Sequence, residues 1–195
     1  ELLCQYKHVC VAGNHDWAAI DKIDTSDFNP DAAAACHWTT QQLTPEDIGY
    51  LNSLPLVIQR GDFTLVHGCP RDPIWEYLLS VSSARENFTY FQSQFCLVGH
   101  SHVPLVFEHN ETGVCFFNGF PTDSVLTLAK NRLIINPGGV GQPRDGDPRA
   151  SYAVYDSEAR SVTHYRIPYD ISATQARMVE YGLPRRLVSR LSYGL

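Results

Sequence analysis

The stretch Cys96-Leu97-Val98-Gly99-His100-Ser101-His102 contains the strand end and the histidine pair from which the fold class and a candidate site can be predicted. Residues 96–98 are typical of the end of a buried strand, and Gly99 interrupts the apolar run. If the backbone stays extended, His100 and His102 point to the same side, because side chains alternate along a strand. Both imidazoles would then lie beyond the carboxyl end of the strand, where open α/β sheets bind ligands. The pair predicts a metal site, and the alternative is two hydrogen-bonded loop histidines.

Two other predicted strands end in the same way. Residues 7–12 are followed by Gly-Asn-His-Asp at residues 13–16, and residues 63–66 are followed by His-Gly at residues 67–68. Together the three strand ends supply nitrogen and oxygen donors that suit a divalent or trivalent transition metal. The candidate residues are Asn14, His15, His67, His100 and His102.

The order of the remaining elements predicts the fold class. Helical composition and capping residues predict helices at residues 30–43, 45–54, 72–78, 82–88, 173–181 and 184–191. Hairpins are expected for residues 56–59 with 63–66, 104–108 with 114–117, 124–128 with 132–135, and 151–155 with 161–167. Helices alternate with strands early and hairpins dominate late, which predicts an α/β protein. We expect a layered α/β/β/α sandwich with mixed sheets that forms a single domain over residues 1–195.

Composition narrows the class of protein and its partners. The chain has 195 residues, of which 44% are hydrophobic and 18% charged, as in an ordinary globular protein. Its formal charge of −6 is a poor match for duplex nucleic acid. No apolar stretch is long enough to cross a bilayer, so no membrane partner is expected. The six cysteines are scattered without a Cys-x-x-Cys motif, which favours reduced thiols and a cytoplasmic location.

The three strand ends, in this order, resemble the second half of the signature of the calcineurin-like metallophosphoesterases. Residues 136–144, Asn-Pro-Gly-Gly-Val-Gly-Gln-Pro-Arg, are similar to the small bacterial and archaeal branch of that family. The resemblance covers essentially the whole chain. It implies the calcineurin-like fold and a metal-dependent phosphoester hydrolase that is phosphodiesterase-like and acts on a small-molecule or nucleotide-type substrate.

The resemblance also assigns roles to the candidate residues. It makes Asn14, His67 and His100 ligands of one metal ion and His102 a ligand of a second. His15 would lie near the scissile phosphate and protonate the leaving oxygen. Two ions, of manganese, iron, zinc or nickel, would hold a bridging hydroxide and clamp the phosphoryl oxygens for in-line attack.

One departure from the family pattern stands out. The family has an Asp-x-His motif and a Gly-Asp motif upstream, and neither precedes Gly13. Residues 1–6 look like the end of a helix, so we expect an upstream segment that carries the first two strands. Without it, we expect weak metal binding, reduced or absent activity, and a sheet edge and an apolar surface that stay uncovered.

Several residues keep two interpretations. Arg144 and, with less force, Arg71 are candidates for gripping a substrate phosphate, although Arg144 has an equal claim to an ion pair with Asp145 or Asp147. Asp16 either orients His15 or caps the following helix. Core packing is favoured over base stacking for five aromatic residues: Trp75, Tyr77, Phe88, Tyr90 and Phe91. A solvated helix face is favoured for three arginines: Arg185, Arg186 and Arg190.

Two other functions compete with hydrolysis of a small phosphoester. A non-catalytic scaffold on the same fold would use an apolar surface to bind a partner, but it has no need of His15 and the histidine pair. A nuclease is disfavoured by the acidic charge balance. The oligomeric state does not follow from the sequence.

Overall fold

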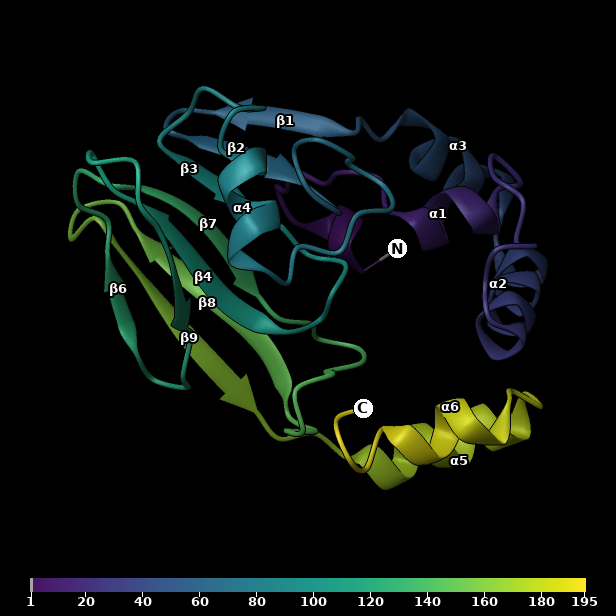
Figure 1. Ribbon diagram of the computed structural model, residues 1–195. Helices are drawn as coiled ribbons and strands as arrows, with labels where there is room; N and C mark the ends of the chain where they lie inside the picture. The colour runs from purple at the N-terminus through teal and green to yellow at the C-terminus, as the bar shows by residue number, and fades with distance from the viewer. Residues whose placement is uncertain (1) are drawn as a thin grey trace.

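The computed structural model describes residues 2–195, within which two β-sheets pack face to face (Figure 1). Sheet A contains, in spatial order, β1 (Val57–Arg60), β2 (Phe63–Val66), β3 (Phe95–Leu97), β7 (Arg132–Pro137), β4 (Pro104–His109) and β5 (Cys115–Gly119). Sheet B contains β6 (Val125–Thr127), β9 (Ser161–Ile167) and β8 (Ala150–Asp156). Sheet A is mixed and sheet B is antiparallel. The predicted α/β class with layered sheets is confirmed.

The centre of sheet A is parallel, and this determines where the site forms. β2 pairs with β3 and β3 pairs with β7, all in the same direction, with Leu65 opposite Leu97 and Leu97 opposite Ile135. The carboxyl ends of parallel strands meet at one edge of a sheet. Three segments that are far apart in the sequence therefore emerge side by side: residues 67–68, 99–102 and 138–144.

Sheet A is covered on both faces. On one face, Phe88 and Phe91, which follow helix α4 (Val81–Asn87), pack with Phe107 and other buried side chains. On the other face, Phe95 and Val106 pack against residues of sheet B such as Val162. Burying each of these large side chains contributes about 2 kcal/mol. The core interpretation is therefore correct for Phe88 and Phe91.

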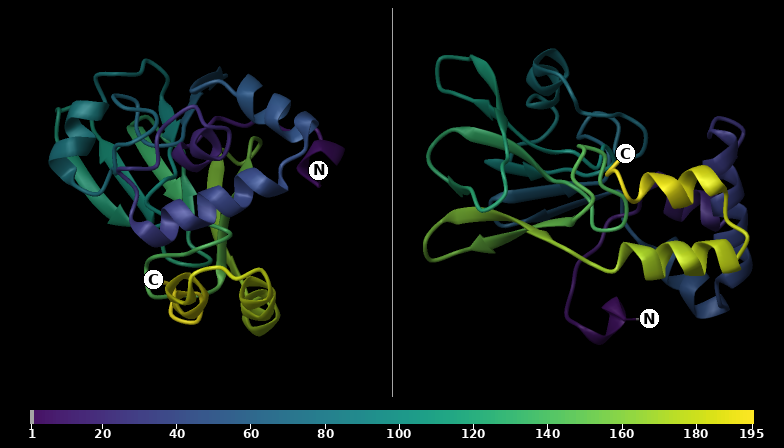
Figure 2. Two further views of the ribbon diagram at one scale, coloured as in Figure 1. Left: turned by 90° about the vertical axis from the view of Figure 1, so that its right-hand side faces the viewer. Right: turned by 90° about the horizontal axis from the view of Figure 1, so that it is seen from below.

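The other helices gather at the end of the sandwich where the parallel strands finish (Figures 1 and 2). They are α1 (Asn14–Ala19), α2 (Pro30–Gln42), α3 (Pro45–Ser53), α5 (Ile171–Glu180) and α6 (Arg185–Arg190). The predicted caps are present: Asn29 accepts a hydrogen bond from the Ala32 N–H, and Thr44 forms a capping box with Asp47. The helix starts could thus be read from the sequence.

Two predicted elements next to the candidate site are wrong. Residues 7–12 form no strand within the described chain, where the Ala12 N–H donates to the Pro55 carbonyl at 2.9 Å. Residues 72–78 form a loop instead of a helix, because the carbonyl oxygens of Asp72 and Pro73 accept the N–H groups of Cys69 and Gly68 and are not available to helical donors. Glu1 lies outside the described residues, and Leu3–Gln5 form the short 3-10 helix η1.

Two packing expectations are also wrong. The three-residue spacing of Ile48, Leu51 and Leu54 predicts that α3 packs one face on the core, but this helix buries no residue and Ile48 is 41% exposed. The hairpin expected for residues 124–128 and 132–135 does not form, because β6 joins sheet B and β7 joins sheet A. β7 carries four consecutive buried residues and is paired on both sides, by β3 and β4, so a central position in sheet A satisfies it better than a hairpin.

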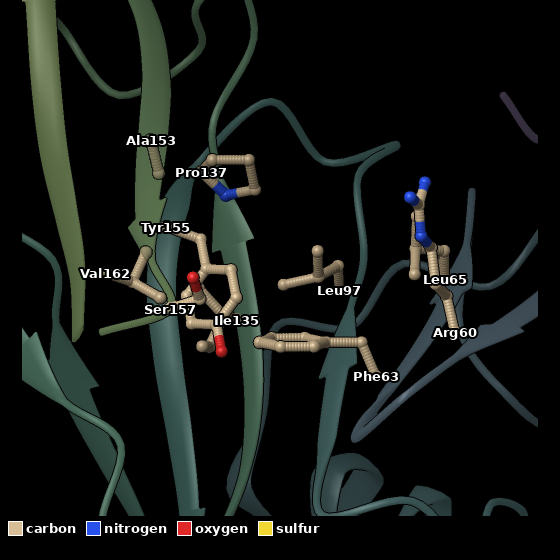
Figure 3. Close-up of a pocket in the computed structure, with 10 residues that line it drawn as sticks. All are labelled: Arg60, Phe63, Leu65, Leu97, Ile135, Pro137, Ala153, Tyr155, Ser157 and Val162. Atoms are coloured by element: carbon tan, nitrogen blue, oxygen red, sulfur yellow. The ribbon is translucent and has the colours of Figure 1, made fainter. Parts of the chain in front are cut away.

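An apolar groove of about 490 Å³ lies between the two sheets (Figure 3). Its walls include Phe63, Leu97 and Ile135 of sheet A and Ala153 and Tyr155 of sheet B. β8 is the edge strand of sheet B on this side, with no further strand beside it within residues 2–195. Of the helices in residues 2–195, none combines the length and apolarity needed to cross a bilayer.

Candidate active site

Three of the predicted metal ligands come together at the edge of sheet A. Nε2 of His67, which follows β2, lies 3.0 Å from Oδ1 of Asn14 at the start of α1. The same atom lies 3.0 Å from Nδ1 of His100, which follows β3. We call Asn14, His67 and His100 the donor trio.

The donor trio fits one metal ion. Imidazole nitrogens bind such ions at about 2.0–2.1 Å, so two ligands at a right angle lie about 3 Å apart, as the donor atoms do here. Nε2 of His100 lies 3.1 Å from the Trp75 carbonyl, which fixes the ring with Nδ1 toward the trio. Asn14 supplies the third donor, an amide oxygen, alongside the two histidines.

His102 lies beside the trio but does not complete a second site. Its Nδ1 is 2.6 Å from the Gln142 carbonyl, which leaves Nε2 as its available ligand atom. Across residues 2–195, no point is surrounded by three or more His, Cys, Asp or Glu side chains placed to hold an ion. The described residues therefore fit one ion and supply only His102 toward a second.

The loop that carries the two histidines is held by the buried side chain of Asn136. Its Nδ2 donates to the Gly99 carbonyl at 2.7 Å and to Oγ of Ser101 at 2.9 Å. Its Oδ1 accepts the Gly138 N–H at 2.9 Å. His100 and His102 both have a φ of 59°, in the left-handed region that costs a non-glycine residue about 1–3 kcal/mol. The extended backbone expected at this pair is therefore wrong, and Asn136, which sequence reasoning did not single out, stabilises the actual conformation.

Gly13 and Asp16 shape the other side of the trio. A Cβ atom at Gly13 would lie 2.8 Å from Nδ1 of His67, so only glycine leaves room for this ring. The Gly13 N–H donates to the Asp16 carboxylate at 2.8 Å, which caps the first turn of α1. Of the two roles considered for Asp16, the structure shows the cap.

The histidines of the site are held in their neutral form. Burial, reinforced by the neighbouring rings of His100, His102 and His15, lowers the pKa of His67 to about 3. Burial, and then the charge of Arg144, lowers the pKa of His102 to about 4. Neutral imidazole is the form that ligates metal ions, so the site is ready to bind an ion at neutral pH.

His15 lies next to the trio without being part of it. Its Nδ1 is 3.2 Å from the thiol sulfur of Cys36, and the Phe28 ring packs edge-on at 5.1 Å between centroids. These contacts fix the ring and leave Nε2 available. His15 lines the same cavity as Asn14 and His100, which suits the predicted role at a leaving group.

The cavity at the site has a volume of about 450 Å³ and combines rings with positive charge. Arg144 lines it and donates to Oε1 of Gln142 at 3.0 Å. Asp145 pairs with Arg166, and Asp147 pairs with Arg149, so the alternative ion pairs of Arg144 are not formed. The residues lining the cavity include Asn14, His15, Asp27, Phe28, Trp75, Tyr77, His100, Arg144, Arg186 and Arg190.

Four of these lining residues correct the sequence interpretation. Trp75 and Tyr77 line the cavity and do not form helical core, and the Tyr77 ring stacks on His100 at 3.9 Å. Arg186 is exposed, as a solvated helix face predicts, and Arg190 is half-buried, but α6 also places both residues at the cavity, which the sequence interpretation did not include. Only the tertiary position of the C-terminal helices shows this, because no local pattern in residues 184–191 points to a site.

Arg71 is not brought to the cavity. Its guanidinium pairs with Glu76 and Glu86, and Glu76 also accepts hydrogen bonds from the Cys69 thiol and the Ser83 hydroxyl. This network fixes the loop of residues 69–80 behind the site. Arg71 therefore has a structural role in this loop.

The Arg71–Glu76 network predicts a pH-dependent stability. Burial alone would raise the pKa of Glu76, but hydrogen bonds from Arg71, Cys69 and Ser83 outweigh burial and lower it to about 2. Because the folded pKa lies below the ordinary value of 4.5, the stabilisation is complete above about pH 4.5 and is lost as the pH falls toward 2. Urea unfolding of Glu76→Gln should show a loss of about 2 kcal/mol at pH 7.

The same experiment contains its own check. The difference between the parent and Glu76→Gln should shrink toward zero near pH 2.5, since glutamine resembles a protonated glutamate. Glu111→Gln, in the exposed turn between β4 and β5, serves as the matched control. A difference that does not change with pH would show that Glu76 acts by packing alone.

Comparisons with known proteins agree with this geometry. The family model described as the calcineurin-like phosphoesterase superfamily domain matches residues 1–160. The "Uncharacterized protein MJ0912" of Methanocaldococcus jannaschii is 33% identical over 199 aligned positions, which cover 100% of this chain and 79% of the relative. The crystal structure of a metallophosphoesterase from Sphaerobacter thermophilus is 48% identical, with a TM-score of 0.87, over 96% of this chain and 77% of that one. The hypothetical protein PH1004 from Pyrococcus horikoshii OT3, 19% identical with a TM-score of 0.77 over 100% of this chain and 76% of that one, shares the fold.

Proposed function

Because the chain belongs to the calcineurin-like phosphoesterase superfamily, whose members generally bind two divalent metals, we propose that it is a metal-dependent phosphoester hydrolase. We further propose phosphodiesterase-like action on a small-molecule or nucleotide-type substrate, and a cytoplasmic location, in keeping with six free thiols. The observation that carries the proposal is the donor trio, with its three donor atoms linked by separations of 3.0 Å at the edge of sheet A.

The residues around the cavity divide the chemistry between them. A divalent ion held by Asn14, His67 and His100 would supply Lewis acidity, which would neutralise phosphoryl oxygens and lower the pKa of water. Arg144 binds the phosphoryl group by charge-assisted hydrogen bonds. His15, held through Nδ1 beside Cys36, delivers a proton from Nε2 to the leaving oxygen when it is in its imidazolium form, which becomes less populated as the pH rises because burial and the charge of Arg144 lower the pKa of His15. His102 contributes one ligand toward a second ion.

Hydrolysis of bis-p-nitrophenyl phosphate tests the proposal. We expect turnover that rises with added Mn²⁺ and disappears with EDTA, and we expect His67→Ala to lose turnover and Mn²⁺ binding together. His37→Ala, an exposed position on α2, is the matched control and should behave as the parent. Turnover that survives EDTA, or a His67→Ala variant equal to the parent, would overturn the proposal.

A further inference from the structure

Three arginine side chains converge on the cavity that contains His15 and His100. Arg144 follows β7, whereas Arg186 and Arg190 come from α6. One carboxylate, that of Asp27, shares the lining with these three guanidinium groups, although the chain as a whole carries a charge of −6. The charge at the cavity is therefore positive, although the net charge of the protein is negative.

The side chains of Asp and Glu do not neutralise these arginines. Among residues 2–195, the ion pairs between side chains involve Arg71, Arg149, Arg160 and Arg166 and none of the three cavity arginines. Arg144 donates to the Gln142 side-chain oxygen, and Nε of Arg190 donates to the main-chain oxygen of Leu195, the last residue of the sequence. Burial, together with the charges of Arg144 and Arg186, lowers the pKa of Arg190, as expected when like charges are held close together. An anion in the cavity would relieve this repulsion.

The helical hairpin that carries two of these arginines is fixed in place. Gln175 of α5 donates to the Val188 carbonyl at 2.8 Å and to Oγ of Ser192 at 2.9 Å. The Gly146 N–H donates to the Gly194 carbonyl at 2.9 Å, and the rings of Trp38 and Tyr181 lie 5.2 Å apart. The hairpin, which lies beside α2 (Figure 2), is thus tied to α2 and to the loop after β7. Its arginines are therefore positioned before any ligand binds.

Aromatic rings form another part of the cavity wall. Phe28 and Trp75 pack edge to face, with 5.7 Å between their centroids. Trp75 is 40% exposed and Tyr77 is 48% exposed, so both rings offer contact surface to a ligand. Rings of this kind bind flat heterocycles by stacking. A volume of about 450 Å³ lies in the range of pockets that enclose ligands the size of a nucleotide.

We infer that this cavity binds a nucleotide with at least two phosphoryl groups, with Arg186 and Arg190 holding the phosphoryl group that does not react and Trp75 and Phe28 contacting the base. The inference rests on the proposed function in one respect, because that function determines which phosphoryl group reacts. It goes further in naming the substrate class and in giving the C-terminal hairpin a role in specificity. Binding itself requires no turnover, so the two can be tested separately.

Calorimetric titration in EDTA, with ADP, AMP and inorganic pyrophosphate as probes, tests the inference. We expect ADP to bind at least 10-fold more tightly than AMP, because the second phosphoryl group reaches α6. Arg186→Gln and Arg190→Gln should each weaken ADP binding about 10-fold. Arg185→Gln, on the same helix but outside the cavity, is the matched control and should bind as the parent. Trp75→Ala should weaken ADP binding more than pyrophosphate binding.

The outcomes separate the inference from the proposed function. Equal affinity for ADP and AMP, or an effect of Arg185→Gln as large as those of Arg186→Gln and Arg190→Gln, would overturn the inference. Arginine-dependent ADP binding in a protein that shows no metal-dependent hydrolysis would support the inference and reject the proposed function. If circular dichroism shows that a glutamine variant does not fold, Arg186→Lys and Arg190→Lys replace it, because they keep the charge but lose the bidentate geometry and should weaken ADP binding less.

Discussion

Replacing His15 with alanine is expected to lower the turnover of phosphodiesters with alkoxide leaving groups by about 10²- to 10⁴-fold, the range that general acid catalysis contributes. The structure holds the ring through Nδ1 at Cys36 and places it on the cavity wall beside the donor trio. Because His15 is not part of the trio, metal affinity should not change. The predicted defect is therefore in kcat with the metal content preserved.

A series of leaving groups makes this test specific. A p-nitrophenolate leaves readily without a proton, so His15→Ala should affect bis-p-nitrophenyl phosphate much less than a dialkyl diester, which must expel an alkoxide. Cys36→Ala, which removes the neighbour of Nδ1, should give a smaller defect in the same direction. An equal loss for all leaving groups, or loss of metal from His15→Ala, would show that the residue acts as a ligand or a positioning group.

The sequence predicts the features of this fold that depend on local chemistry. Asn29 and Thr44 are capping residues followed by proline, and α2 and α3 begin where these residues place them. The turn residues Arg60-Gly61-Asp62 between two short apolar runs predict the β1–β2 hairpin, which the structure contains. The pairing of β6 and β7 could not be predicted in this way, because the competition between a local hairpin and two separate sheets is decided by burial of the whole of β7. The loop at residues 72–78 could not be predicted either, because the N–H groups that occupy the Asp72 and Pro73 carbonyls come from the preceding residues Gly68 and Cys69.

The residues of the candidate site also differ in whether local sequence patterns predict them. Apolar runs that end in polar residues identified Asn14, His67 and His100, and parallel pairing of β2 and β3 then brings their side chains together. The place of Arg186 and Arg190 at the cavity could not be predicted, because a helix with arginines resembles any solvated helix until its neighbours are known. The role of Asn136 could not be predicted either. Its three hydrogen bonds go to Gly99, Ser101 and Gly138, and none of these contacts leaves a periodic pattern in the sequence.

Replacing Asn136 with alanine is expected to reduce both the free energy of unfolding and the affinity for metal. The side chain is fully buried, and its loss leaves the Gly138 N–H without its partner. It also removes one of two hydrogen bonds from the Gly99 carbonyl, which still accepts the Ser101 N–H, and from the Ser101 hydroxyl, which still accepts the Val103 N–H. One unsatisfied buried group, two lost hydrogen bonds and the cavity left by the side chain bring the expected total to about 3–5 kcal/mol. His100 and His102 would also lose the support that keeps them in the left-handed conformation, so Mn²⁺ affinity should fall about 10- to 100-fold.

Urea unfolding and calorimetric titration with Mn²⁺ measure the two effects of Asn136→Ala. Ser101→Ala removes one of the three hydrogen bonds and should cost about 1 kcal/mol, which gives a folded variant if Asn136→Ala is too unstable to purify. Asn118→Ala, which loses a hydrogen bond to Glu108 on the exposed side of β5, is the matched control and should change stability by less than about 0.5 kcal/mol and metal affinity not at all. The positive φ values link the two readouts: if Asn136 supports the strained histidine conformations, Ser101→Ala should lose a smaller share of both stability and affinity, in the same order. If Asn136→Ala loses stability but binds Mn²⁺ as tightly as the parent, the prediction for metal affinity is wrong. His100 would then keep its position without Asn136.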